Sequence, residues 1–249
     1  VIGAGPSAEA LIPRIASPAV RERLFIVAAD TALAPLSAFG ITPDVTVVQE
    51  GQSYNLYDFL PISHWEWSGN ARPFMWLDLT SADIVPRLRR PADSLPEGYC
   101  GFFMSRFFPT RLFDRLARRN LLPPMVPPLG SVGSTAVELA LSFFRGNVFI
   151  AGLDFSFYYG KTHMRGAPLN LRELLISDRF SPVGSSPVLF PEGSVYPVTG
   201  PGATGEHGFP VLLTNGILST YASTFRERFY SGRERLRIVG AGGVDLGIP

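Results

Sequence analysis

The chain has 249 residues, of which 46% are hydrophobic and 17% charged, and 22 Lys and Arg against 21 Asp and Glu give a net charge of +1. This length suits one large domain or two small ones, and the apolar fraction excludes a disordered chain. Because a near-zero net charge attracts no polyanion, we expect no non-specific binding to nucleic acid.

The elements predicted in chain order alternate between strand and helix in the first half, as βαβ units do. Apolar runs predict strands at 1–2, 24–28, 45–48, 74–77, 147–151 and 236–239. Helical spacing predicts a helix starting near Ala8 and further helices at 32–38, 134–144 and 219–231, with an Arg-rich amphipathic segment at 111–119. The sequence therefore predicts an α/β fold of the Rossmann-like, doubly wound type with a mainly parallel sheet.

The alternation breaks down between residues 155 and 216, where Gly, Pro, Ser and aromatic residues dominate. Ordered loops of this length are uncommon unless they are lids or binding loops. We expect a single domain, 1–249, in which 155–216 is a loop-rich insertion or lid.

Neither a membrane span nor a secretory signal is evident. No apolar run approaches the roughly 20 residues that cross a bilayer, and no basic segment with a following apolar stretch opens the chain. The single Cys100 cannot form an internal disulfide, which indicates either a reducing compartment or indifference to redox; together with the lack of a signal, this leads us to expect a cytoplasmic protein. The chain lacks an initiator Met and begins inside a predicted strand, so we also expect it to be a piece of a longer protein.

The first candidate site is the turn Gly3-Ala4-Gly5-Pro6-Ser7, between a predicted strand and a predicted helix. Glycine lets the backbone approach a ligand, and a helix N-terminus offers free N–H groups to an anion. The third glycine of the dinucleotide fingerprint and the Gly-Lys-Ser/Thr of a P-loop are absent. The turn therefore indicates either a nucleotide site or a structural turn.

Two further candidates lie where helices begin. Asp30 follows the strand 24–28, at the edge where open α/β sheets bind ligands, and either accepts hydrogen bonds from a ribose or caps the next helix. The turn Gly130-Ser131-Val132-Gly133-Ser134 offers N–H groups and hydroxyls to a carboxylate or phosphate. Capping by Ser134 is the structural alternative, which accounts for one of the two serines.

The fourth candidate combines a strand end with the loop that follows it. Gly152-Leu153-Asp154 places a carboxylate at the edge of the sheet, and the loop 160–166 contains the only lysine, Lys161, together with His163 and Arg165. A surface loop explains these residues equally well, but a loop after a strand end favours catalysis. We expect Lys161 and Arg165 to lower the pKa of His163.

The remaining histidines are weaker candidates. His207 is a second choice as an acid or base, and His64 lies among aromatic residues, which is more typical of packing or partner contact. We find neither the Cys/His spacing of a zinc site nor an Asp-x-Asp pair for a divalent ion, and no Gly-x-Ser-x-Gly nucleophile elbow.

Together these motifs resemble the MptE-like domain family, which includes the central domain of bacterial motility accessory factors. The resemblance rests on residues 3–7, 28–33, 40–44, 130–132, 152–154 and 160–163, with Gly242-Gly243 near the end. In this family, archaeal members are 6-hydroxymethyl-dihydropterin diphosphokinases that use ATP and Mg²⁺. Motility accessory factors are implicated in attaching nonulosonic sugars to flagellin, and their core looks like bacterial sialyltransferases with CMP-sugar donors.

The resemblance implies roles for the candidate residues. Gly3 to Ser7 and Ser131 to Ser134 would cradle nucleotide phosphate and sugar carboxylate, while Asp154 and the loop after it would approach the cytidine or the donor. The implied nucleotide- or donor-binding residues are Gly3, Gly5, Pro6, Ser7, Asp30, Ser131, Gly133, Ser134, Gly152, Asp154 and Lys161.

Chemistry favours one branch of the family. Diphosphoryl transfer requires a metal clamp, and kinase-type members carry Asp-x-Asp after the Pro-Asp strand, where this chain has only Glu50. A CMP-sugar has a good leaving group, so hydroxyl and amide donors plus one base suffice. We therefore expect a glycosyltransferase that moves a nonulosonic sugar from a CMP donor to a protein such as flagellin, without a metal or other cofactor, using His163 as acid or base.

Two alternatives stay open. One is an ATP- and Mg²⁺-dependent pterin diphosphokinase. The other is a non-catalytic nucleotide-binding or scaffold module, in which the aromatic segment 54–67 contacts a partner.

Overall fold

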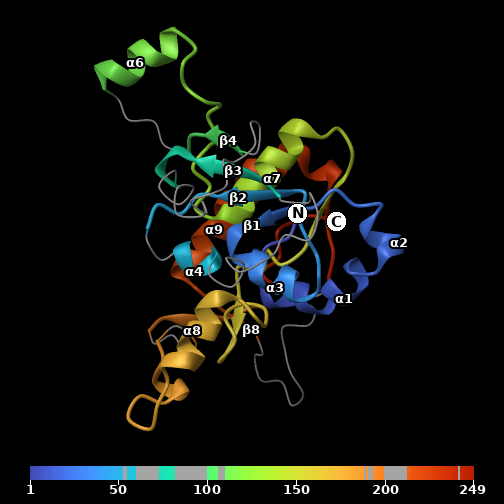
Figure 1. Ribbon diagram of the computed structural model, residues 1–249, viewed down its shortest axis with the longest axis vertical. Helices are drawn as coiled ribbons and strands as arrows, with labels where there is room; N and C mark the ends of the chain where they lie inside the picture. Colours follow the sequence, from blue (N-terminus) through green and yellow to red (C-terminus); the bar gives the residue numbers. More distant parts are fainter. Residues whose placement is uncertain are drawn as a thin grey trace, which may run out of the picture.

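The structure is a computed structural model that describes residues 1–52, 55–59, 73–81, 100–105, 110–187, 189, 193–198, 212–240 and 242–249. Its centre is an all-parallel sheet in the order β1-β2-β3-β4 (Figure 1). These strands are β1 Val27–Ala29, β2 Val45–Val48, β3 Phe74–Asp78 and β4 Cys100–Phe103. The parallel arrangement flanked by helices confirms the predicted α/β class.

Ile2 lies beside β1, at one side of this sheet, and connects it to a second parallel pair. It forms parallel bridges with Ala28 in β1 and with Ala151, directly after β5 Val148–Ile150. β5 in turn pairs with β9 Leu236–Ile238. The chain thus builds β1 to β4 on one side of Ile2 and returns to place β5 and β9 on the other, so the strand order reverses between Ile2 and β5.

Helices cover both faces because neighbouring strand residues point to opposite sides. On one face, Val27, Val45 and Val47 pack against Ala136 and Leu139 of the helix α7. On the other face, Ala28 packs with side chains of the helices η1, α1 and α3. The first layer consists of α7 Val132–Phe143 and α9 Gly216–Phe229, and the second of η1 Pro6–Ala10, α1 Ile12–Ile15, η2 Asp30–Ala32, α3 Leu33–Ala38 and α4 Leu56–Phe59 (Figure 1).

The region expected to be loop-rich contains regular elements. β6 Phe157–Tyr158, β7 Val195–Pro197 and β8 Leu212–Asn215 form an antiparallel sheet in the order β6-β8-β7. The same region also contains the helix α8 Pro168–Ile176 and the turn η6 Val183–Ser185. These strands have two to four residues, too few for a periodic pattern to reveal them. A lid function for this region stays a prediction.

The other elements lie at the periphery: α2 Pro18–Arg21, η5 Leu79–Ser81, α6 Arg111–Arg118 and η8 Tyr230–Arg235. α6, the predicted Arg-rich segment, projects from the body of the molecule, and none of its residues is buried (Figure 1). Thr110 begins this helix by accepting a hydrogen bond from the backbone N–H of Phe113. In the described part of the chain, no helix is long and apolar enough to cross a membrane.

Candidate functional site

A cavity of about 390 Å³ opens where the strand order reverses. Open α/β sheets bind ligands at this position, at the carboxyl ends of the strands. The walls come from the loops after Ile2, β1 and β5, from the loop 162–163, and from the first residues of α7 and α9. Of the predicted site residues, the cavity brings together Gly3, Gly5, Ser131, Gly133, Gly152, Asp154 and His163.

Three glycines allow the loops after Ile2 and β5 to touch. The N–H of Gly3 donates to Ala151 O at 2.8 Å, and that of Gly5 to Gly152 O at 2.9 Å. A Cβ atom on Gly5 would lie 2.7 Å from the carboxyl carbon of Asp154, and Gly152 has a φ of +70°. These glycines are therefore required by the backbone itself, and their predicted contact with a nucleotide stays a prediction.

Asp154 fastens the turn Gly3–Ser7 to the end of β5. Its buried carboxylate accepts hydrogen bonds from the backbone N–H of Ser7, at 2.8 Å, and from the Ser7 hydroxyl. Burial raises the pKa of Asp154, and the two bonds from Ser7 oppose that shift. Ser7 and the buried Pro6, both predicted to bind the nucleotide, contribute nothing to the described cavity wall.

The N-terminus of α7 forms a second wall. Ser131 caps the helix by accepting a hydrogen bond from the N–H of Ser134 at 3.1 Å, and the two hydroxyls lie 3.0 Å apart. The structural alternative, capping by Ser134, is therefore wrong: the helix begins at Val132, two residues earlier than predicted. Ser134, also predicted to bind the donor, is fully buried in the first turn and does not line the cavity. Ser131, Val132 and Gly133 face the cavity.

The N-terminus of α9 forms a third wall that the sequence analysis missed. Asn215 caps this helix by accepting a hydrogen bond from the N–H of Leu218 at 2.9 Å, and Asn215, Ile217 and Leu218 line the cavity. The signal was present as Asn215-Gly216, since asparagine is a preferred capping residue. The first N–H groups of two long helices thus point toward the same space.

The side chain of His163 lines the cavity, and its hydrogen bonds leave one ring nitrogen available. It is half-buried, and its Nδ1 lies 3.0 Å from the Thr162 hydroxyl. Burial lowers its pKa, so the imidazole is neutral at neutral pH.

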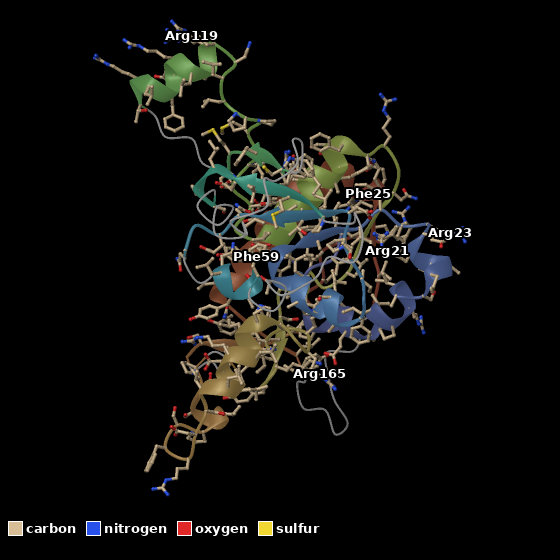
Figure 2. All side chains as sticks on the ribbon, in the orientation of Figure 1. Arg21, Arg23, Phe25, Phe59, Arg119 and Arg165 are labelled. Carbon is tan, nitrogen blue, oxygen red and sulfur yellow. The ribbon has the colours of Figure 1, made fainter. Side chains whose placement is uncertain are left out.

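The expected cause of this shift, the charges of Lys161 and Arg165, is wrong. Lys161 Nζ lies 2.5 Å from a Glu9 carboxylate oxygen and Arg165 Nε lies 3.1 Å from the other, so both cations are paired. Arg165 extends away from the body into solvent (Figure 2), and Lys161 is not among the residues that line the cavity.

Asp30 lies behind the cavity rather than in it. Its buried carboxylate accepts hydrogen bonds from the N–H of Thr31 at 2.9 Å and from Asn55 Nδ2 at 3.0 Å, whereas Ala29 and Thr31 line the cavity. The carboxylate of Asp58, in α4, accepts a hydrogen bond from the Thr31 hydroxyl at 3.4 Å. The predicted ribose contact is therefore not supported by the direction of this side chain.

Asp30 and Asp58 form an acidic pair. Burial, with repulsion from Glu50, raises the pKa of Asp30 to about 6. Burial and the charges of Asp30 and Glu50 raise the pKa of Asp58 to about 8. The pair therefore retains a proton near neutral pH.

Several predicted residues lie outside the described residues, namely His64, His207 and most of the aromatic segment 54–67. Residues 55–59 of that segment are described: Phe59 is buried, whereas Tyr57 is 37% exposed and lies under the Arg172 guanidinium, 5.6 Å from the ring centre. Among the described residues, no group of three or more His, Cys, Asp or Glu side chains is placed to hold a metal ion.

Comparison with known proteins gives two matches. A family model described as "6-hydroxymethylpterin diphosphokinase MptE-like" matches residues 1–160. A protein of Treponema pallidum (strain Nichols), described as an uncharacterized protein, is 28% identical over 195 residues, which cover 78% of this chain and 31% of that protein. This chain thus spans about a third of the length of that relative. No solved structure matches.

Proposed function

This chain belongs to the MptE-like family, and we propose that it is a transferase whose nucleotide-activated donor binds in the cavity between Ile2 and β5. The donor we propose is a CMP-activated nonulosonic sugar, and the acceptor is a hydroxyl group of a protein such as flagellin. The observation that supports this proposal is that an anion-binding wall and a neutral histidine face the same cavity.

The anion-binding wall suits the donor's phosphate and carboxylate. Ser131 and Asn215 each occupy one N–H group of their helix, which leaves the first N–H groups of α7 and α9 free to donate to a ligand. No Lys or Arg belongs to the described lining, so these N–H groups and the helix dipoles supply the positive potential. A monophosphate and a carboxylate carry less charge than a diphosphate or triphosphate, so helix N–H groups without a cationic side chain suit them.

His163 supplies the base. As the acceptor oxygen forms its bond to the anomeric carbon, the bond from that carbon to the CMP oxygen breaks, and the acceptor proton passes to Nε2 of His163. Because burial lowers the pKa of His163, the ring is in its basic form at neutral pH.

A second candidate, the ATP-dependent diphosphokinase of the family description, is favoured by the acidic pair beside the cavity. Carboxylates are the ligands that Mg²⁺ prefers, and one or two suffice when substrate phosphates complete the shell. Asp30 and Asp58 would hold the ion, but both carboxylates bond to Thr31 of the cavity wall and neither lines the cavity, so the transferred phosphates would have to reach the ion past Thr31. His163 would then accept the proton of a hydroxymethyl group in the same cavity.

Thermal unfolding with nucleotides distinguishes the two. We expect CMP to stabilise the chain without Mg²⁺, by about 2.7 kcal/mol at 100 times its dissociation constant, and more than ATP does. Stabilisation by ATP alone, and only with Mg²⁺, would instead support the diphosphokinase. A chain unaffected by every nucleotide would contradict both proposals.

The role of His163 is tested by His163→Ala. We expect turnover to fall by roughly 10²–10⁴-fold, while the thermal shift with CMP is unchanged, because the base acts on the acceptor rather than on the nucleotide. The matched control is Arg165→Ala in the same loop, which we expect to retain near wild-type turnover because its side chain is 86% exposed. Near wild-type turnover of His163→Ala would remove His163 from the mechanism.

A further inference from the structure

A closed ring of hydrogen bonds surrounds the back of the His163 imidazole. Asn170 Nδ2 donates to the backbone carbonyl of His163 at 3.2 Å, the Thr162 hydroxyl lies 3.2 Å from Asn170 Oδ1, and His163 Nδ1 lies 3.0 Å from the Thr162 hydroxyl. Asn170 belongs to α8, within the excursion 155–216. It lies behind His163 and is not among the residues that line the cavity.

Which group donates in each hydrogen bond of this ring follows from the backbone carbonyl oxygen of His163. A backbone carbonyl oxygen only accepts, so the Asn170 atom facing it is the amide nitrogen, and the atom facing Thr162 is the amide oxygen. The amide oxygen also only accepts, so the Thr162 hydroxyl donates its single proton to that oxygen. Toward His163 the hydroxyl oxygen is left with lone pairs alone, and Nδ1 must be the donor.

We infer that Asn170 and Thr162 are positioning residues that hold the neutral His163 ring in the tautomer with the proton on Nδ1 and the lone pair on Nε2. A neutral imidazole carries one N–H, so fixing it on Nδ1 keeps Nε2 as the acceptor. Among the described residues Nε2 has no hydrogen-bond partner, and the ring lines the cavity. The opposite tautomer would present an N–H to the substrate hydroxyl and remove no proton.

The ring also supports the protonated state. When Nε2 accepts a proton, Nδ1 still donates to the same hydroxyl, and the bond gains strength because its donor is charged. Proton uptake therefore requires no rearrangement of Thr162 or Asn170. This inference rests on the proposed function, in which His163 is the base.

The tautomer is measured directly, without an activity assay. In the chain labelled with ¹⁵N-histidine, long-range ¹H–¹⁵N correlations at a pH above the His163 pKa distinguish a protonated Nδ1 from a protonated Nε2. With three histidines in the sequence, His163→Ala identifies the signal by its loss. We expect protonated Nδ1 in the wild type, and a protonated Nε2 would overturn the inference.

Variants separate positioning from mere packing. Thr162→Val keeps the shape of the side chain but removes the acceptor, so we expect the proton to redistribute toward Nε2 and kcat to fall at least roughly 10-fold with KM unchanged. Thr162→Ser retains the hydroxyl and should restore both. Asn170→Ala, a change on α8, frees the Thr162 hydroxyl to donate to Nδ1 and should shift the tautomer in the same direction.

The outcomes distinguish this inference from the proposed function. A wild-type tautomer in both Thr162→Val and Asn170→Ala, each shown to be folded by its thermal transition, would overturn the inference even if His163→Ala is inactive. A shifted tautomer in these variants, together with full turnover of His163→Ala, would support the ring but remove His163 from the reaction.

Discussion

The parallel sheet has one hollow at the amino ends of its strands (the amino edge) and one at their carboxyl ends (the carboxyl edge). In the described lining of the larger hollow, the charged side chains are already paired with each other. At the amino edge a groove of about 670 Å³ is lined mainly by Phe25, Phe74, Trp76, Phe143 and Phe144, whereas the cavity at the carboxyl edge has about 390 Å³. Arg21, which lies near Phe25 at this amino edge (Figure 2), donates to the carbonyls of Leu24 and Thr42 and pairs with Asp44 at 3.1 Å.

The difference lies in what remains free for a ligand. At the amino edge, Asp44 also accepts a hydrogen bond from the N–H of Ile26, and the aromatic rings contact one another at tilted or edge-on angles, with the ring centres of Phe25 and Phe144 4.7 Å apart. At the carboxyl edge, two helix N-termini and Nε2 of His163 have bonding capacity left. We therefore place the candidate site by its unused donors and acceptors rather than by the size of the hollow.

The largest effect on stability should come from breaking the contact between the loop after Ile2 and the loop after β5, at the carboxyl edge. Gly152→Ala places a Cβ atom 2.5 Å from the carbonyl oxygen of Gly3 at a φ of +70°, and we expect a loss of about 3 kcal/mol or more in the free energy of unfolding. Gly40→Ala is the matched control, because its φ is +68° with nothing within 4 Å, and it should cost about 1 kcal/mol. Equal losses in urea denaturation would show that the loop contact contributes nothing.

A smaller effect should appear in the pH dependence of stability, through the acidic pair at the carboxyl edge. The pKa of Asp58 is raised to about 8 in the folded state, above its unfolded value near ~3.9, so the folded chain binds more protons and loses stability as the pH rises from about 4 through 8. Asp58→Asn cannot ionise, so we expect it to be more stable than the wild type at pH 9 and nearly equal to it at pH 4.

Urea unfolding at pH 4, 6 and 9 measures this difference. Asp114→Asn on the exposed helix α6 removes the same charge and controls for overall electrostatics. A wild type that gains stability between pH 6 and 9, with Asp58→Asn less stable at pH 9, would contradict the raised pKa.

The smallest effect compares one residue from each edge. Ser131→Ala removes a helix cap and Phe144→Ala removes a ring that packs at a tilt against Phe25, and each should cost about 1 kcal/mol of stability. Only Ser131→Ala should also reduce the thermal shift with CMP, because it disturbs the N–H groups of α7 that face the cavity. If Phe144→Ala reduced that shift as much, the donor would bind at the amino edge.

The sequence was sufficient for elements that carry strong local signals. The β-branched run of β2 was predicted at its observed bounds, 45–48, and α7 within two residues at its start. β4 was missed because Gly101 interrupts four residues of weak strand character. The start of α9 was placed three residues late because Asn215-Gly216 was not interpreted as a helix cap.

The candidate site was predictable as a list of turns but not as an arrangement. Motifs at strand ends and at a helix start identified Gly5, Asp154 and Ser131, which the structure brings to one cavity. Their actual partners come from distant parts of the chain: Ser7 bonds to Asp154 over 147 positions, and Lys161 pairs with Glu9. Such pairings depend on topology, which local patterns do not encode.

The position of Ile2 has a consequence for how the molecule assembles. β1 to β4 follow one another along the chain, but the N-terminal residues join β5 across 148 positions, as the bond from Val1 to Phe149 shows. Closing so long a loop costs more entropy than joining sequential strands, and contacts of high sequence separation slow folding. The cavity walls therefore form only when the two ends of this long loop meet, so we expect the site to be among the last parts of the molecule to be completed during folding.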